Sequence, residues 1–210
     1  SLHQMGFRVI MDVVYNHTHQ YGLAKNSVLD KVVPGYYHRL DPITGIVEQS
    51  TCYTCGNTAT ERVMMAKLMT DSLVTWAEDY KIDGFRFDLM GHQPKEAMLA
   101  AREAVRAVDP DTYFYGEGWN FGEVANNRQF VQASQLELGG SEIGTFSDRL
   151  RDAVRGPGNN TRDTQGIGNG LLTLPNERQE QADSKAQYQL RLDQVRIGLA
   201  GNLANFPLDE

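Results

Sequence analysis

The sequence predicts an α/β fold in which parallel strands are covered by helices. Short apolar runs at 7–15, 82–89 and 112–117 are separated by longer segments, and this alternation is typical of a parallel sheet with helices outside it. An acidic residue stands at or near the carboxyl end of each run. Both closed barrels and open doubly wound sheets carry functional groups at those ends, so either architecture fits.

Composition and charge narrow the class of protein. The 210 residues suffice for one large domain or two small ones, and the net charge is −7. An acidic chain is poorly suited to neutralise phosphates, which argues against a nucleic-acid partner. The sequence contains no run of about 18 apolar residues that could span a membrane. Because residue 1 is Ser and an apolar strand follows at once, we expect an internal piece of a longer protein, whose missing signal peptide says nothing about compartment.

The first strand and the segment after it begin the fold. Residues 7–15 are almost continuously apolar, as in a parallel strand covered on both faces, with Asp12 near the end and Asn16–His17 where the strand opens into a loop. Residues 18–57 show no period and are far too long for an ordinary connection of about 2–6 residues. We interpret them as a lid or small subdomain, rather than a floppy insertion, that packs on Tyr36–Tyr37–His38.

The two cysteines, Cys52 and Cys55, form one C-x-x-C motif inside this insertion. A zinc site of four cysteines is incomplete without a second pair. A thioredoxin-like motif would open a helix after a strand, and this motif lies in a long loop. Two interpretations stay open, a local disulfide that staples the loop of an exported protein and a pair of idle thiols.

A helix and the central strand come next. Thr58 and Glu61 have the spacing of a capping box, which predicts a helix that begins at Thr58 and ends near Lys81. Its stripe at steps of three and four consists of Met65, Met69, Ser72 or Leu73, Trp76 and Tyr80. In the strand at 82–89, alternation places Gly84, Arg86 and Asp88 on one face. The Arg86–Asp88 pair is either a structural ion pair or part of an active site.

The remaining elements continue the alternation. Pro94 suits the first turn of a helix that ends before Asp109–Pro110 and that carries Met98, Ala101, Val105 and Val108 on one face. The strand at 112–117 ends on Glu117, and Trp119 follows it. A fourth strand is predicted at 143–148, a short helix at 149–155 and an irregular loop at 156–170. The last predicted helix carries the stripe Tyr188, Leu192, Val195, Leu199 and Leu203.

Three carboxylates at strand ends suggest a catalytic pair. If the strands are neighbours about 4.8 Å apart, Asp88 and Glu117 lie close together, and carboxyls about 5–5.5 Å apart suit a retaining glycosidase. Arg86 would keep Asp88 ionised as the nucleophile, while Glu117, in a more apolar setting among aromatic residues, would hold its proton longer. Trp119 offers a flat face on which a sugar ring can stack.

Three motifs, DVVYNH at 12–17, GFRFD at 84–88 and GEGW at 116–119, resemble successive signature regions of the α-amylase family in the family's order. The longer matches at 11–17, 27–37, 81–92, 115–124 and 144–156 resemble its debranching branch, the bacterial pullulanases and plant limit dextrinases. This resemblance implies hydrolysis of α-1,6 branch links in pullulan, amylopectin or limit dextrins. The alternatives are another α-glucan-active enzyme, such as an amylase or a branching enzyme, and a non-catalytic glucan-binding relative.

The resemblance also implies an architecture. The family fold is a (β/α)8 TIM-type barrel, of which this chain would supply about strands 3–6 with their helices. All of residues 1–210 would then belong to one catalytic barrel domain, and 18–57 would be the insertion between the third strand and its helix.

Residue roles follow from motif position. Asp88 is implied as nucleophile, Glu117 as general acid/base and Arg86 as the group that orients Asp88. The implied substrate-binding residues are Asp12, Asn16, His17 and, as further contacts, His92 and Trp119. The family's fourth region, a His-Asp pair after the seventh strand, is absent, so we expect the 210 residues alone to be inactive.

The remaining expectations concern ligands and location. The chemistry requires no cofactor and we assign no metal site, although calcium is common in the family as a structural ion. The expected partner is an α-glucan, with no nucleic acid and no membrane span. The expected location is secreted, cell-surface or periplasmic in a bacterium and the plastid in a plant.

Overall fold

The computed structural model describes residues 2–158, 164–176 and 184–201, and the chain divides into two compact units, Ser1–Phe146 and Ser147–Glu210. That both belong to one catalytic barrel domain stays a prediction.

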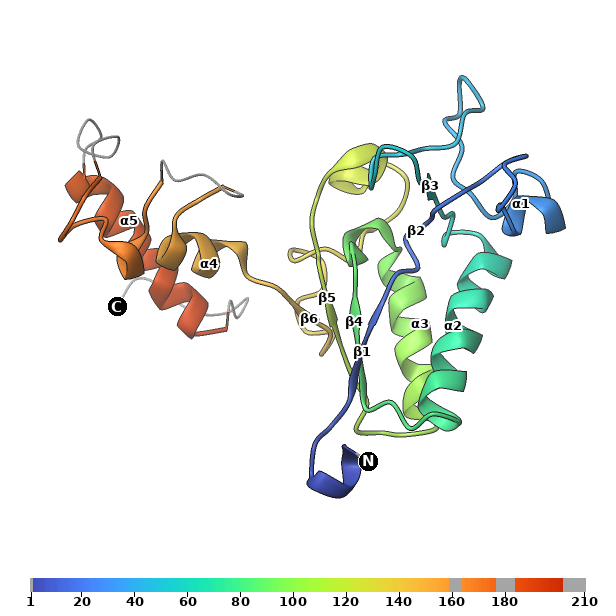
Figure 1. Cartoon of the computed structure of the whole chain (residues 1–210), viewed down its shortest axis with the longest axis horizontal. Coiled ribbons are helices and arrows are strands. Elements are labelled where there is room, and N and C mark those ends of the chain that lie inside the picture. Colours follow the sequence, from blue (N-terminus) through green and yellow to red (C-terminus); the bar gives the residue numbers. More distant parts are fainter. Residues whose placement is uncertain (1, 159–163, 177–183, 202–210) are drawn as a thin grey trace. The chain divides into compact units, whose positions relative to one another are not determined.

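The first unit is built on the predicted parallel sheet. Its strands are β1 (Ile10–Val13), β4 (Gly84–Phe87), β5 (Tyr113–Gly116) and β6 (Gly144–Thr145), in the order β1-β4-β5-β6 (Figure 1). All three pairings are parallel. The strands are shorter than the apolar runs that predicted them, because only part of each run has a hydrogen-bonded neighbour. Within the described residues the sheet is open, which makes it a partial barrel.

Two helices, α2 (Val63–Glu78) and α3 (Lys95–Arg106), lie side by side on one face of this sheet (Figure 1). The core between sheet and helices centres on Phe85, Phe87 and Phe114, with ring centroids 5.1–6.4 Å apart. Each of these rings is at most 2% exposed. Truncating such a buried phenylalanine to alanine typically lowers the free energy of unfolding by about 3–5 kcal/mol. The three rings therefore hold the strands together, and the side chains on the opposite face of the sheet depend on this packing.

The opposite face carries the polar side chains. The register pairs Asp12 with Arg86, Arg86 with Tyr115 and Tyr115 with Gly144, so these residues form one row across the sheet. The neighbouring row of Met11, Phe85 and Phe114 points toward the helices. Strand alternation alone therefore brings Arg86 between the first and third strands.

The insertion folds around buried polar groups. Its ends meet in a two-stranded antiparallel ladder, β2 (His17–Thr18) with β3 (Gly56–Asn57), and it contains a short helix, α1 (Leu29–Val32). Asp30 accepts hydrogen bonds from the backbone N–H groups of Gly22 and Gly35, and its Oδ2 lies 3.0 Å from Nδ1 of the fully buried His38. The packing expected of the Tyr36–Tyr37–His38 stretch is present, because Tyr36 and Tyr37 meet edge to face at 5.1 Å.

The predicted start of α2 is wrong. The helix begins at Val63 with Arg62 at its N-cap and no capping side chain, because Glu61 binds Arg39 instead of the helix terminus. Its end at Glu78 also precedes the predicted Lys81, and Tyr80, 61% exposed, does not belong to the buried stripe. The fully buried face consists of Met65, Met69, Leu73 and Ala77, with Trp76 partly buried beside it.

The α3 helix follows its prediction more closely. Pro94 is its N-cap, and Met98, Ala101 and Val105 are buried. Val108 lies beyond the last helical residue and is 38% exposed, so it was wrongly included in the face. Short 3-10 turns, η1 (His3–Met5), η2 (Met90–His92) and η3 (Gly122–Asn127), occur before β1, after β4 and after β5.

The second unit contains α4 (Asp148–Arg155), η4 (Ile167–Asn169) and α5 (Ser184–Leu199). The α4 helix confirms its prediction, and Ser147 caps it by accepting a hydrogen bond from the Leu150 N–H at 3.2 Å. In α5 the predicted stripe is not a buried face, since Leu199 is 78% exposed. Leu203 lies outside the described residues.

Candidate active site

Three carboxylates from three neighbouring strands meet on one guanidinium. Arg86 Nη1 donates to Asp12 Oδ1 at 3.0 Å and to Asp88 Oδ1 at 3.2 Å, and Arg86 Nη2 donates to Glu117 Oε1 at 2.6 Å. These four residues, predicted from the strand ends, therefore come together at the carboxyl edge of the sheet. The expected contact of Arg86 with Asp88 is present, and the arginine is shared with Asp12 and Glu117.

The charge of Arg86 is secured by its partners. Burial disfavours the cation, but hydrogen bonds and charge interactions with Asp88, Glu117 and Asp12 outweigh burial and raise the pKa of Arg86. The Arg86 side chain is 19% exposed, whereas Asp12 is 67% exposed. Exposed ion pairs contribute little to stability, so the contact of Asp12 with Arg86 is the easiest of the three to break.

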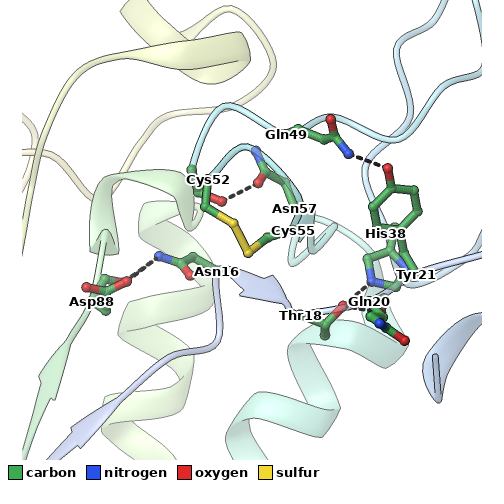
Figure 2. Close-up of a disulfide and its surroundings, with 11 residues drawn as sticks. Asn16, Thr18, Gln20, Tyr21, His38, Gln49, Cys52, Cys55, Asn57 and Asp88 are labelled. Atoms are coloured by element: carbon green, nitrogen blue, oxygen red, sulfur yellow. Dashed lines mark hydrogen bonds between the residues drawn. A yellow bond between two sulfur atoms is a disulfide. The ribbon is translucent and has the colours of Figure 1, made fainter. Parts of the chain in front are cut away.

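Asp88 is held from both sides. Its Oδ1 accepts from Arg86, and its Oδ2 accepts from Asn16 Nδ2 at 3.2 Å. Figure 2 shows Asn16 reaching Asp88, and the same amide also donates to the Asp88 backbone carbonyl at 3.0 Å. Asn16 is 1% exposed, so its position is fixed by packing. The two partners fix the orientation of the carboxylate plane.

Glu117 lies in a charged setting, not in the apolar one that its aromatic neighbours suggested. Besides the contact with Arg86, its Oε2 accepts from the Leu89 backbone N–H at 3.0 Å. Both of its carboxylate oxygens are therefore held by hydrogen-bond donors. The sequence pattern was misleading because Tyr113, half exposed, and Tyr115 stack on each other beneath the site, with ring centroids 5.6 Å apart.

The backbone after β4 is strained where it serves the site. Leu89 has φ 40° and ψ 48°, a left-handed conformation that non-glycine residues rarely adopt and that aims its N–H at Glu117. Two residues later, a Cβ at Gly91 would clash with the Trp119 carbonyl oxygen, so only glycine lets these two loops approach. Nothing in the sequence pointed to Leu89.

His17 lies close enough to Asp88 to feel its charge. It is half-buried in β2, and burial is the main reason why the pKa of His17 is lowered, while the nearby charge of Asp88 acts in the opposite direction. The imidazole is therefore neutral near pH 7, able to both donate and accept a hydrogen bond.

His92 is placed differently from its prediction. Its side chain has no exposed surface, its Nε2 is 2.9 Å from Ser50 Oγ, and its ring packs on Phe121 at 4.6 Å. This position favours a supporting role over direct contact with a ligand. Trp119 is half-buried on the loop that follows Glu117, and its stacking role stays a prediction.

A second ion-pair network adjoins His92, and no sequence pattern pointed to it. Arg39, 2% exposed, binds Glu123 at 2.7 Å and Glu61 at 2.9 Å. Asn57 Nδ2 donates to Glu123 Oε1 at 2.9 Å, and Ser50 Oγ donates to Glu123 Oε2. Burial raises the pKa of Glu123, but hydrogen bonds with its neighbours outweigh burial and hold it far below the ordinary value. This network ties the insertion to the loop after β5.

A polar pocket opens on that same loop. Its volume is about 340 Å³, and its lining is dominated by amides. The lining residues are Gly118, Asn120, Asn126, Asn127, Gln132, Ser134, Gln135, Leu136 and Glu137. Amide side chains can donate and accept hydrogen bonds at once, which suits hydroxyl-rich ligands. The sequence reasoning missed this pocket, because its residues have no period.

Among the described residues, the one group of three metal-ligating side chains is His17, Cys52 and Cys55. The two cysteines form a disulfide, which decides between the two interpretations of the motif in favour of the loop staple. No helix within the described part of the chain is long and apolar enough to cross a membrane.

Comparison with known proteins gives strong matches. A pullulanase from Klebsiella aerogenes is 52% identical over an alignment of 210 positions, which covers 97% of this chain and 18% of that protein. A chloroplastic pullulanase from Arabidopsis thaliana is 43% identical over an alignment of 220 positions, gaps included, which covers 99% of this chain and 22% of the relative. No family model matches the chain.

Solved structures agree. The crystal structure of a Klebsiella pneumoniae pullulanase complexed with maltotriose superposes with a TM-score of 0.86 at 50% identity, over 97% of this chain and 19% of that one. The chain thus spans about a fifth of the length of these relatives.

Proposed function

Because the chain belongs to the pullulanase family, within the debranching branch of the α-amylase family, we propose that it forms part of a starch-debranching glycoside hydrolase. The substrate class is α-glucans with α-1,6 branch links, as in pullulan, amylopectin or limit dextrins. The observation that carries this proposal is the convergence of Asp88 and Glu117 on the single guanidinium of Arg86. Two carboxyls from adjacent strand ends are the groups that a retaining glycosidase needs.

The proposed reaction proceeds by double displacement. An Asp88 carboxylate oxygen attacks the anomeric carbon, the glycosidic C–O bond breaks, and Glu117 gives its proton to the leaving oxygen. The product is a glycosyl ester of Asp88. Glu117 then takes a proton from water, whose oxygen attacks the anomeric carbon and releases Asp88, so the anomeric configuration is retained.

This mechanism places a requirement on the Arg86–Glu117 pair. Glu117 must give a proton to the leaving oxygen in the first step, whereas in the free protein its Oε1 accepts a hydrogen bond from Arg86 at 2.6 Å. We infer that the pair opens when substrate enters the site. Glu117 is 21% exposed, so its carboxyl can turn toward a ligand. Asn16 and Arg86 would meanwhile keep Asp88 aligned.

The other site residues would bind the glucose unit on either side of the scissile bond. The neutral imidazole of His17 and the exposed carboxylate of Asp12 can hydrogen-bond to hydroxyls of the glucose unit that Asp88 attacks. Trp119 would contact the glucose unit on the other side of the scissile bond, next to Glu117. The amide-lined pocket beyond Glu117 is a further place for sugar hydroxyls. His92 would act indirectly, by holding the insertion against the loop after β4.

Product analysis tests the proposal against its alternatives. The intact enzyme that carries this chain should release maltotriose from pullulan, whose α-1,6 links join maltotriose units, and leave linear amylose almost untouched. Rapid cleavage of amylose would instead identify an amylase, and new branches on amylose a branching enzyme. Binding of both glucans without any turnover would identify a non-catalytic relative.

The 210 residues alone should hydrolyse no glucan. Their described part forms an open sheet of four parallel strands, and an open inner face does not enclose a substrate. A soluble, monomeric and active preparation of residues 1–210 would refute this.

The proposed chemistry needs no cofactor, so dialysis against EDTA should leave the turnover unchanged at a temperature where the protein stays folded. Loss of structure on dialysis would reveal a structural calcium ion. The Cys52–Cys55 disulfide supports an exported bacterial enzyme, because disulfides persist in oxidising compartments, and the chloroplastic relative leaves the plastid as the alternative. Thiol labelling of the protein isolated under acid quench tests this, since a fully labelled pair contradicts it.

A further inference from the structure

We propose that the Cys52–Cys55 disulfide masks a zinc-binding site, which is formed when a dithiol reduces the disulfide and which takes His17 as its third ligand. The ligand atoms of these three residues already lie within 4.8 Å of one another. A tetrahedral zinc ion with two thiolates and one imidazole needs them about 3.5–3.8 Å apart, given Zn–S near 2.3 Å and Zn–N near 2.0 Å.

The positions of the ligands suit such a site. The Cα atoms of Cys52 and Cys55 are 5.4 Å apart, and the spacing of a cysteine, two residues and a cysteine is that of many zinc sites. Cys55 is 6% exposed, whereas Cys52 and His17 are half-buried. His17 Nδ1 is itself buried and has no hydrogen-bond partner among the described residues, so a ligand there replaces no existing bond.

The arrangement does not depend on the disulfide. The β2–β3 ladder pairs His17 with Asn57, two residues beyond Cys55. On the other side of the motif, Thr51 Oγ1 donates to Asn57 Oδ1 at 2.5 Å, and Asn57 Nδ2 donates to Ser50 Oγ at 3.0 Å. Hydrogen bonds therefore fix both ends of the loop that carries the cysteines. Figure 2 shows the disulfide between Asn57 on one side and the hydrogen-bonded Asn16 and Asp88 on the other.

The site forms in two steps, a reduction and a metal-binding step. A dithiol gives two electrons and two protons to the disulfide, becomes a cyclic disulfide itself and leaves two cysteine thiols. Zinc binding then expels both thiol protons and forms two Zn–S bonds and one Zn–N bond. Three protein ligands leave one position for water. The oxidised protein has no thiolate to offer and so has no site.

Zinc at this position would inhibit the proposed hydrolase, because it withdraws His17 from the sugar. This second consequence rests on the proposed function, whereas the binding itself does not. The oxidised enzyme should be insensitive to zinc at concentrations that inhibit the reduced enzyme.

The test uses the intact enzyme, prepared oxidised and after reduction with a dithiol that is then removed without oxygen. Zinc chloride is titrated by calorimetry, and bound zinc is counted by metal analysis after desalting. We expect one additional zinc ion per chain in the reduced form. The Cys52→Ser/Cys55→Ser double variant should bind none of this additional zinc. His17→Ala should weaken binding by at least about tenfold, since the loss of a direct ligand costs no less than the loss of a residue that supports one. His19→Ala, an exposed histidine two residues away, should change nothing.

The outcomes separate the two claims. Equal zinc content in the reduced wild type and the double variant overturns the site, as does a His17→Ala affinity equal to that of the wild type. If zinc binds as expected while pullulan turnover is unchanged, the site stands and the role of His17 in substrate binding fails.

Discussion

The hydrogen bond from Arg86 to Glu117, at 2.6 Å, is shorter than the contacts of the same guanidinium with Asp12 and Asp88. In the free protein the arginine thus holds the proposed acid more closely than the proposed nucleophile. A short charge-assisted bond stabilises the resting site and has to be given up for proton transfer. The first predictions separate the roles of these side chains.

Asp88→Asn should abolish turnover and preserve glucan binding. The amide keeps the shape of the side chain but cannot form the glycosyl ester, so kcat on pullulan should fall on the order of 10⁴-fold. Calorimetry with maltotriose should give a Kd within about threefold of the wild type. Asp79→Asn, an exposed residue after α2, serves as the matched control and should keep full activity. Surviving turnover in Asp88→Asn would show that the nucleophile lies elsewhere.

The loss of rate caused by Glu117→Gln should depend on the leaving group of the substrate. On pullulan the first step should slow by about 10²–10⁴-fold, because the leaving oxygen receives no proton. On an α-maltosyl fluoride the first step should be nearly unchanged, since fluoride leaves without protonation, and azide should speed the second step. Pre-steady-state release of fluoride measures this. An equal loss on both substrates contradicts the acid role.

Arg86→Lys should be far from conservative. A lysine is a single point charge and cannot bond to three carboxylates in the fixed fork geometry of a guanidinium. Because the ammonium group contacts fewer of the carboxylates, their ionised forms are stabilised less. The acid limb of the pH profile of kcat/KM should therefore move to higher pH, and kcat should fall at least tenfold. An unchanged acid limb with a raised KM alone would assign Arg86 to substrate binding.

Glu123→Gln should destabilise the protein although Glu123 does not belong to the proposed catalytic pair. The variant leaves the buried Arg39 with one charged partner, and breaking a buried pair typically costs about 3–5 kcal/mol. Denaturant unfolding measures this loss, and Glu103→Gln, 74% exposed, is the control.

The same carboxylate sets a pH dependence. The pKa of Glu123 is lowered by folding, so its contribution is fully present above the ordinary glutamate pKa of 4.5 and is lost as the pH falls below that value. The stability difference between wild type and Glu123→Gln should therefore shrink on acidification from pH 5. A difference that stays constant down to pH 3 would exclude the carboxylate as its origin.

Asp30→Asn should loosen the insertion. The side chain is 5% exposed and joins Gly22, Gly35 and His38, so the amide would place a donor where a backbone N–H now donates. We expect a loss of about 1–3 kcal/mol and faster cleavage within residues 18–57 by limited proteolysis. Asp71→Asn, which removes an exposed pair with Lys67, should give the wild-type digestion pattern.

The sequence was most informative where local pattern and position on the sheet coincide. Strand alternation and the strand ends were enough to bring Asp12, Arg86, Asp88 and Glu117 together, because parallel strands must end at the same edge. The same reasoning failed at Glu61, where an ion pair with Arg39, 22 residues away in the chain, overrides the capping box.

Side chains without a period could not be placed from the sequence. The setting of Glu117 is decided by Leu89, whose left-handed backbone no propensity predicts. The burial of His92 depends on contacts with Ser50 and Phe121, from two loops that share no pattern with it. Such contacts are set by tertiary packing, which is invisible in a window of neighbouring residues.

The shared carboxylate of Glu123 has a consequence for any attempt to engineer this region. Arg39, Ser50 and Asn57 all bond to it, so their mutational free energies cannot be summed as if each site were independent. In a double-mutant cycle, the second substitution should lower the free energy of unfolding by less than it does alone, because the first has already broken hydrogen bonds of the same cluster. Libraries that vary these positions one at a time will therefore misjudge which combinations survive.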